Sequence, residues 1–133
     1  MPLAWEVLLE TNYWVVKAKP SQNDLSDVQA GRELKWYTAK RPRLQPGDRV
    51  FIWSASPKLR IEGLAEVSRA GTRVGGVFIF RLRHLTPPLP NPVDIHECKR
   101  LRHVRQASFF KPGPMGTVAK LLPEQGRELF SAI

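Results

Sequence analysis

Apolar and polar residues alternate in several short stretches of this chain, which is the pattern of β-strands. The clearest stretch is 49–53, where Val50 and Ile52 are expected to face one side and Phe51 and Trp53 the other. Both of these sides are apolar, as in a strand that is covered by protein on each face. The pattern therefore predicts a central strand of a curved sheet or small barrel.

More strands are predicted on both sides of this segment. The stretches 60–69 and 76–85 predict two longer strands that are joined by a turn at 70–72. Residues 34–37 are extended, but the segment is too short to predict a regular strand. Further short strands are expected at 13–17, 108–110 and 117–121.

The predicted helices are few and short. A capping-box pattern at 21–24 and a glycine at Gly31 delimit a helix over 22–30. Asp94 caps a second short helix, and Pro123 lies in the first turn of a terminal helix. The buried side of the terminal helix is expected to carry Leu129, Phe130 and Ile133. Five to seven short strands with such helices predict an α+β domain built on a compact mixed barrel.

Composition is typical of one ordinary globular domain. The chain has 133 residues, 42% of them apolar, and we expect a single domain over 1–133. Its one cysteine, Cys98, cannot form an internal disulfide, and no export signal is visible. No apolar run approaches the roughly 18 residues that predict a membrane span. We therefore expect a soluble cytoplasmic protein without a membrane partner.

The chain is strongly basic, with 21 Lys and Arg, 12 Asp and Glu and a net charge of +9. Residues 1–31 carry two basic and four acidic side chains, whereas residues 32–60 carry eight basic and two acidic ones. A basic field favours polyanions, of which nucleic acid is the commonest; a basic surface kept only for solubility is the alternative. The side chains expected to contact phosphates are Lys17, Lys19, Lys40, Arg41, Arg43 and Lys58.

The sequence lacks the patterns of common catalytic and metal sites. His84, His96, Cys98 and His103 do not have the spacing of a zinc site. There is no phosphate-binding loop, dinucleotide fingerprint or nucleophile elbow. Most acidic residues fall in helix caps or turns, so no carboxylate pair for acid–base work is indicated. We expect no catalytic residues, no metal and no cofactor.

Trp36 is the aromatic residue that most suggests a ligand contact. It follows the charged Lys35 and precedes Tyr37 and Thr38 on the short extended segment, where an aromatic is less expected to fill the core. For Trp53 a structural and a functional role remain equally open. Aromatic plates beside hydroxyl groups and positive charge suit a nucleic-acid base that is taken out of its stack.

Five short motifs follow one another along nearly the whole chain. They are formed by Trp14, Lys17 and Pro20, then Trp36, then Gly47, Asp48 and Ser54, then Gly63 and Val67, and finally Ser108, Phe109, Lys111, Pro114, Gly116 and Thr117. Their order resembles the EVE domain family, a member of the PUA-like superfamily that includes YTH and ASCH domains.

The resemblance implies a closed, curved β-barrel with peripheral helices and a pocket for a flipped, modified base. Implied bases are 5-methylcytosine, 5-hydroxymethylcytosine and N6-methyladenine, in DNA or RNA. It also implies a possible effector, such as a nuclease or motor, supplied by another chain. The expected pocket residues are Ser21, Gln22 and Asn23 of a polar loop, Trp36, Tyr37 and Thr38, and Trp53 and Ser54.

Two other functions remain open. A PUA- or ASCH-like RNA-binding module would bind structured RNA through its basic face without selecting a modified base. It differs from the first interpretation in that Trp36 and Ser54 would be separated by core. A small hydrolase or nuclease acting on nucleotides would instead need a cluster of carboxylates or histidines.

Overall fold

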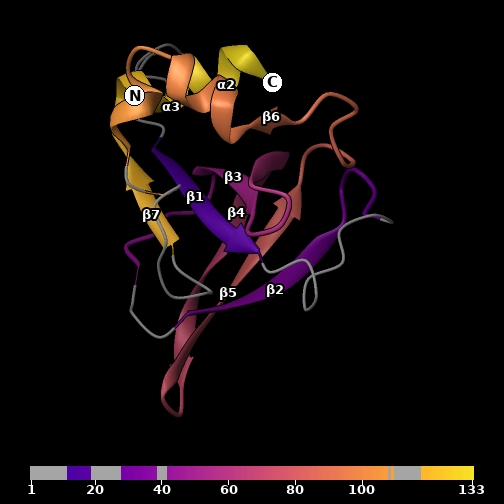
Figure 1. Cartoon of the computed structure of the whole chain (residues 1–133). Helices are drawn as coiled ribbons and strands as arrows, with labels where there is room; N and C mark the ends of the chain where they lie inside the picture. Colours follow the sequence, from indigo (N-terminus) through magenta and orange to yellow (C-terminus); the bar gives the residue numbers. More distant parts are fainter. Residues whose placement is uncertain (1–11, 19–27, 39–41, 108, 110–117) are drawn as a thin grey trace, which may run out of the picture.

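A computed structural model of the chain shows a curled, mixed β-sheet with helices gathered at one end (Figure 1). The structure describes residues 12–18, 28–38, 42–107, 109 and 118–133. The strands are β1 (Tyr13–Ala18), β2 (Glu33–Thr38), β3 (Arg49–Ser54), β4 (Arg60–Val74), β5 (Val77–His84), β6 (Val93–Asp94) and β7 (Val118–Leu121). The helices are α2 (Ile95–Arg100), the 3-10 turn η1 (Val104–Gln106) and α3 (Pro123–Ala132).

The seven strands form one sheet in the order β2-β5-β4-β3-β1-β7, with β6 paired to β4 off this path. The pair β1–β3 is parallel, and the other pairs are antiparallel. The predicted α+β mixed sheet is therefore confirmed. Among the described strands β2 and β7 remain edges, so the sheet is curled, without the complete closure that the family resemblance implied.

Strand β3 divides the interior into two hydrophobic cores, as the alternation at 49–53 predicted. Val50 and Ile52 belong to a first core, which is lined by β1, β2, β3, β4 and β5. Phe51 and Trp53 belong to a second core, which β3 shares with α2, η1 and α3. All four side chains are buried. The helices thus cover one face of β3, and the curled sheet itself covers the other.

The two helices predicted after Asp94 and at Pro123 are confirmed at their starts, and one detail of the second is corrected. Asp94 caps α2, because its Oδ1 accepts a hydrogen bond from the Glu97 backbone N–H at 2.9 Å. Pro123 lies in the first turn of α3, and Leu129 is buried against the second core. Phe130 was expected on the buried side but is exposed. One residue after Leu129, it lies about 100° further around the helix and faces solvent.

The turn predicted at 70–72 is wrong, because β4 continues through these residues to Val74 and the chain reverses at Gly75 and Gly76. Gly71 has a φ of +95°, and the pairing with β5 shifts register before it, between Val67 and Arg69, and again across it, between Arg69 and Thr72. A glycine with positive φ suits a turn and a β-bulge equally well. Here it bends a long strand.

The segment 34–37, predicted to be irregular, is the centre of the regular strand β2. Its pairing with β5 over six residues supplies the regularity that its own sequence does not show. The helix expected over 22–30 lies mostly outside the described residues, and its described end at 28–30 is not helical. Of the strand expected at 108–110, only Phe109 is described, and it lies buried outside the sheet.

His84, at the end of β5, is buried, and its Nε2 atom has no hydrogen-bond partner among the described residues. Burial, followed by the positive charge of Arg32, lowers the pKa of this imidazole from its usual 6.5. The folded protein therefore binds this proton less readily than the unfolded chain does. Acidification through the unfolded-state pKa must then favour unfolding.

Replacing Gly71 by alanine is expected to lower the free energy of unfolding by about 2 kcal/mol or more. The new Cβ would clash with the backbone of Ile79, and the positive φ of residue 71 would add strain for an alanine. Gly76→Ala is the matched control, because nothing lies within 4 Å of the added carbon, so a change below about 1 kcal/mol is expected. Urea denaturation of both variants measures the difference; equal stabilities would contradict the bulge.

Stability should fall on acidification from about pH 7 to about pH 5.5, by at most about 1.4 kcal/mol per pH unit for His84. His84→Gln should remove this part of the pH dependence. The pKa values of the Glu33, Glu62 and Glu128 carboxyls lie below 4.5, so these groups add to the loss of stability only at lower pH. Denaturation at the two pH values tests this, and an unchanged pH dependence in the variant would assign the effect to another group.

Candidate nucleic-acid interface

Trp36 lies in the middle of β2, opposite Phe80 of β5, and its side chain is part of the first core. Only 5% of its surface is exposed. The expectation that this tryptophan adds little to the core is therefore wrong, because strand pairing turns every second residue of β2 inward. Its indole Nε1–H is buried and has no acceptor among the described residues, which is rare for a buried donor.

Trp53 packs in the second core, where its ring meets Phe109 edge to face with centroids 5.2 Å apart. Trp36 and Trp53 therefore lie in different cores, separated by the sheet. The prediction that both line one base pocket is wrong. The alternation in β3 already placed Trp53 away from Val50 and Ile52, and those two residues share the first core with Trp36.

Thr38 and Ser54 are both buried on the side of the sheet that faces the first core. Thr38 follows Trp36 by two positions on β2, which puts both side chains on one face. Ser54 continues the row of Val50 and Ile52 and pairs with Ala18 of β1. Tyr37, the remaining predicted pocket residue of β2, points the opposite way and is 55% exposed.

Ser54 has a partner that sequence reasoning missed, since its Oγ donates a hydrogen bond to Glu62 Oε2 at 2.6 Å. Glu62 is buried, and the Lys58 Nζ and Arg60 Nε atoms lie 3.3 and 2.8 Å from its Oε1. Burial alone would raise the pKa of Glu62, but hydrogen bonds from Ser54, Arg60 and Lys58 outweigh it and lower the pKa. The sequence offered one sign of this cluster, namely an acidic residue, Glu62, among the apolar positions of the strand predicted at 60–69.

The structure places the predicted phosphate-binding residues in different environments. Lys17 is buried on β1, and burial lowers the pKa of its ammonium group, so it does not form part of the surface. Lys58 is half exposed but is paired with Glu62. Arg43 is exposed. The other predicted site residues, Lys19, Lys40 and Arg41 among the phosphate contacts and Ser21, Gln22 and Asn23 in the pocket, lie outside the described residues.

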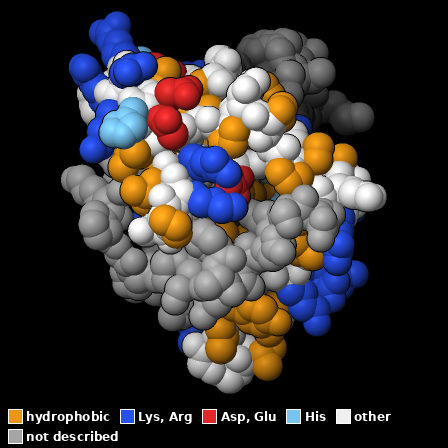
Figure 2. Space-filling model, turned by 45° about the vertical axis from the view of Figure 1, so that its right-hand side comes forward, with side chains coloured by type: hydrophobic (Ala, Val, Ile, Leu, Met, Phe, Trp, Pro, Cys, Tyr) orange, Lys and Arg blue, Asp and Glu red, His pale blue; other side chains and the backbone are white. Residues whose placement is uncertain are grey.

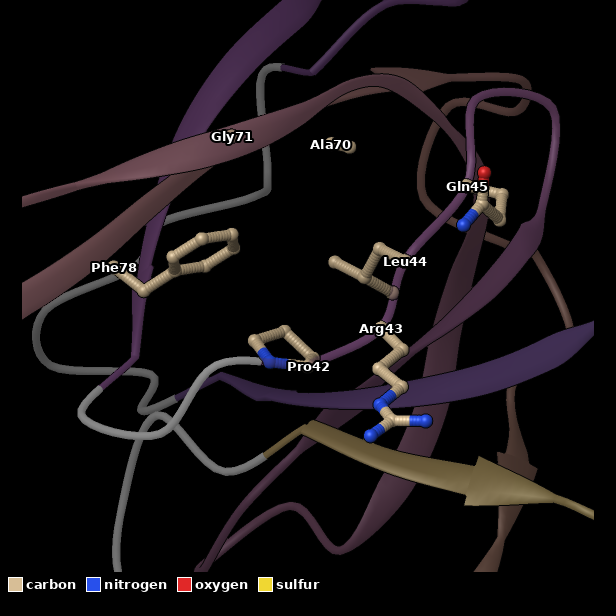
Figure 3. A pocket seen from close by; sticks show the side chains of 7 residues that line it. All are labelled: Pro42, Arg43, Leu44, Gln45, Ala70, Gly71 and Phe78. Carbon is tan, nitrogen blue, oxygen red and sulfur yellow. The ribbon is translucent and has the colours of Figure 1, made fainter.

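Arg43 lines a cavity of about 630 Å³ beside the bulge of β4 (Figure 3). Leu44 and Phe78 point toward each other across it, and Arg43 lies at one side. The backbone of Gly71 forms part of the wall. This cavity is lined by neither Trp36 nor Ser54.

The basic charge is spread more widely than the sequence counts suggested. Figure 2 shows Lys and Arg side chains in separate groups, one at the upper left beside a histidine and another at the lower right. Exposed basic side chains outside the 32–60 segment include Arg69, Arg73, Arg83, Lys99, Arg100, Arg102, Arg105, Lys120 and Arg127. The molecule therefore offers a polyanion more than one basic surface.

Cys98 is buried in the second core, and burial, with the charges of Asp94 and Glu97, raises its pKa to about 12. Its thiol therefore stays protonated near neutral pH. Within the part of the chain that the structure describes, no three His, Cys, Asp or Glu side chains are grouped to hold a metal ion. The described helices also include none long and apolar enough to cross a membrane.

Two of the motif segments quoted above are joined by a buried hydrogen bond. Asp48 Oδ2 accepts from Trp14 Nε1 at 2.9 Å and from the Gln45 backbone N–H at 3.0 Å. The EVE domain family model matches residues 12–132. The chain belongs to the EVE domain family. In this EVE domain the Trp14–Asp48 contact fixes the loop that enters β3 against β1.

Solved structures confirm the fold of this EVE domain. A hypothetical protein from Leishmania major superimposes with a TM-score of 0.75 at 15% identity, covering 92% of this chain and 94% of that one. A protein from Pseudomonas syringae gives 0.73 at 16% identity, with 90% and 98% covered. An ASCH protein from Zymomonas mobilis gives 0.60 at 14% identity, with 90% and 94% covered. A search of curated proteins finds no match.

Trp36→Ala is expected to lower the free energy of unfolding by about 3 to 5 kcal/mol, because it empties part of the first core. Tyr37→Ala is the matched control, since it removes a neighbouring exposed aromatic and should change stability by less than about 0.5 kcal/mol. Chemical denaturation of the two variants tests the placement. A Trp36→Ala protein as stable as the wild type would show that the indole lies outside the core.

Proposed function

We propose that this EVE domain is a non-catalytic nucleic-acid-binding module that recognises a modified base taken out of its stack. The bases in question are 5-methylcytosine, 5-hydroxymethylcytosine and N6-methyladenine. One observation carries the proposal, namely the buried indole N–H of Trp36 that has no acceptor among the described residues. A ring nitrogen or carbonyl oxygen of a base is an acceptor of the kind this donor lacks.

The surroundings of Trp36 support this role. Leaving a buried donor unpaired costs about 1 to 3 kcal/mol, and a ligand that accepts from it would recover that free energy. Thr38 shares the inner face of β2 with Trp36, and Ser54 lies on the same side of the sheet. Both carry hydroxyl groups that can donate or accept. The inner face thus combines an aromatic ring with polar atoms, as base recognition requires.

The energies predict weak selectivity for a modified base. Extrusion of a base costs a few kcal/mol, and stacking on Trp36 returns roughly 1 to 3 kcal/mol. A buried methyl group adds only about 0.8 kcal/mol. Discrimination by the methyl group alone should therefore be several-fold, and a larger ratio would need a polar contact.

The burial of Trp36 favours a second candidate, an RNA-binding module without modified-base selectivity. An indole that is 95% covered in the unliganded fold must be uncovered before a base can stack on it. Ser54 also already donates its hydroxyl hydrogen to Glu62. In this case the basic surface alone would bind RNA, and the unpaired indole N–H would only lower the stability of the fold.

Trp36→Phe separates the two candidates, because it keeps an aromatic ring in the first core but removes the N–H donor. The first candidate predicts that the variant folds and binds oligonucleotides but loses the several-fold preference for the modified over the unmodified sequence, because without the N–H contact the base is no longer held in the orientation that buries its methyl group. Fluorescence anisotropy with matched modified and unmodified strands measures this preference.

Trp53→Phe serves as the control for the same measurement, since Trp53 lies in the other core and should leave the preference unchanged. Absence of any preference in the wild-type protein, with binding retained, would favour the RNA-binding module. A preference that survives Trp36→Phe would remove Trp36 from the recognition site.

A further inference from the structure

The sheet has an outer face, formed by the side chains of β2, β5 and β4 that turn away from the first core, together with Arg49 at the start of β3. Their pairing registers arrange these side chains in rows that run across the strands. The first row is Arg49, Glu66, Arg83 and Glu33; the second is Arg69, Arg81 and Lys35; the third is Thr72, Ile79 and Tyr37.

The first row balances its own charge. Arg49 and Arg83 approach Glu66 at 2.9 and 3.4 Å, and Arg83 lies 3.9 Å from Glu33. Positive and negative side chains alternate along it, each beside an opposite charge. This row needs no external partner.

The second row carries three cations directly opposite one another on adjacent strands. Among the described residues, Arg81 is the only member of this row with an ion pair, at 3.2 Å from Glu33 of the neighbouring row. Lys35 and Arg69 are exposed. The first two rows together hold five cations and two carboxylates, a net charge of +3. Like charges placed directly across a sheet repel each other, and Glu33, which Arg81 and Arg69 both attract, offsets only part of this repulsion. A bound polyanion would relieve the rest.

The third row adds an aromatic surface beside these cations. Tyr37 is 55% exposed on the strand that carries Lys35, and the partly buried Ile79 lies directly opposite it. Residues two apart on a strand are separated by about 6 to 7 Å. A nucleotide can therefore place its phosphate over the cations and its base against the Tyr37 ring, the combination used for single strands.

We propose that the outer face of β2, β5 and β4 binds a single-stranded nucleic acid, with Lys35, Arg81 and Arg69 contacting phosphates and Tyr37 stacking on a base. The inference shares with the proposed function only the class of partner. This surface lies on the opposite side of β2 from Trp36. It gives the exposed Tyr37 a role outside the pocket, as a stacking contact for an unmodified base. Single strands are favoured because their bases are free to stack.

The test uses the full chain and a labelled, unmodified pyrimidine strand, with the duplex of the same sequence for comparison. Tyr37→Ala should weaken single-strand binding about tenfold, within the range of one stacking contact. The double variant Lys35→Gln/Arg69→Gln should reduce the steepness of log affinity against log salt by about 1.4, because each phosphate contact on a single strand contributes about 0.7.

Matched controls come from α2, where Lys99→Gln/Arg100→Gln removes the same charge from exposed residues of another surface. This control should change the slope by much less. Melting temperatures supply a second readout, since relief of like-charge repulsion should leave Lys35→Gln/Arg69→Gln as stable as the wild type or more so. A purely structural role would lower stability instead.

The outcomes also separate this inference from the base pocket. If the outer-face variants bind as the wild type does while Trp36→Phe loses base preference, the inference fails and the pocket stands. If Tyr37→Ala weakens binding but keeps the preference of the wild type, the outer face is a separate site. Equal affinity for the single strand and the duplex, with equal loss in Tyr37→Ala, would overturn the single-strand assignment.

Discussion

The parallel pairing of β1 with β3 is the constraint on which the rest of this EVE domain depends. It places six residues of each strand in register, from Tyr13 opposite Arg49 to Ala18 opposite Ser54. Since β3 is covered on both faces, its successive side chains pack alternately into two separate cores. The hydrogen bond from Trp14 to Asp48 anchors the start of this pairing in the protein interior. Trp53 and Ser54 inherit their directions from this arrangement.

The sequence predicted the fold well where residue alternation and glycine or proline signals are local. The two faces of β3, the Asp94 cap and the start of α3 at Pro123 all follow from such local patterns. Prediction failed where pairing with a distant segment decides the structure. Residues 34–37 become regular only through β5, and the Gly71 signal fits a turn or a bulge until the partner strand is known.

The site was harder to predict than the fold, for the same reason. Neighbouring residues of a strand point to opposite sides, so Trp36 and Tyr37 could not share one pocket once β2 was a regular strand. The partner of Ser54, Glu62, is eight residues away and becomes a neighbour only through the β3–β4 pairing. A charge count along the chain likewise could not show that Lys35, Arg81 and Arg69 form one row across three strands.

Glu62 lies in a β-bulge of β4, at the point where the pairing of β4 with β3 shifts register. The pairing of the two strands therefore does not depend on this residue. Gly63 pairs with Ile52 and Ile61 with Trp53, so Glu62 is the extra residue between two consecutive pairs. Deleting it would leave both pairs in place and every other side chain on its present face. A single codon can therefore add or remove the carboxylate beside Ser54 without reorganising the sheet. Over evolutionary time, the polarity of this inner wall can change independently of the scaffold that carries it.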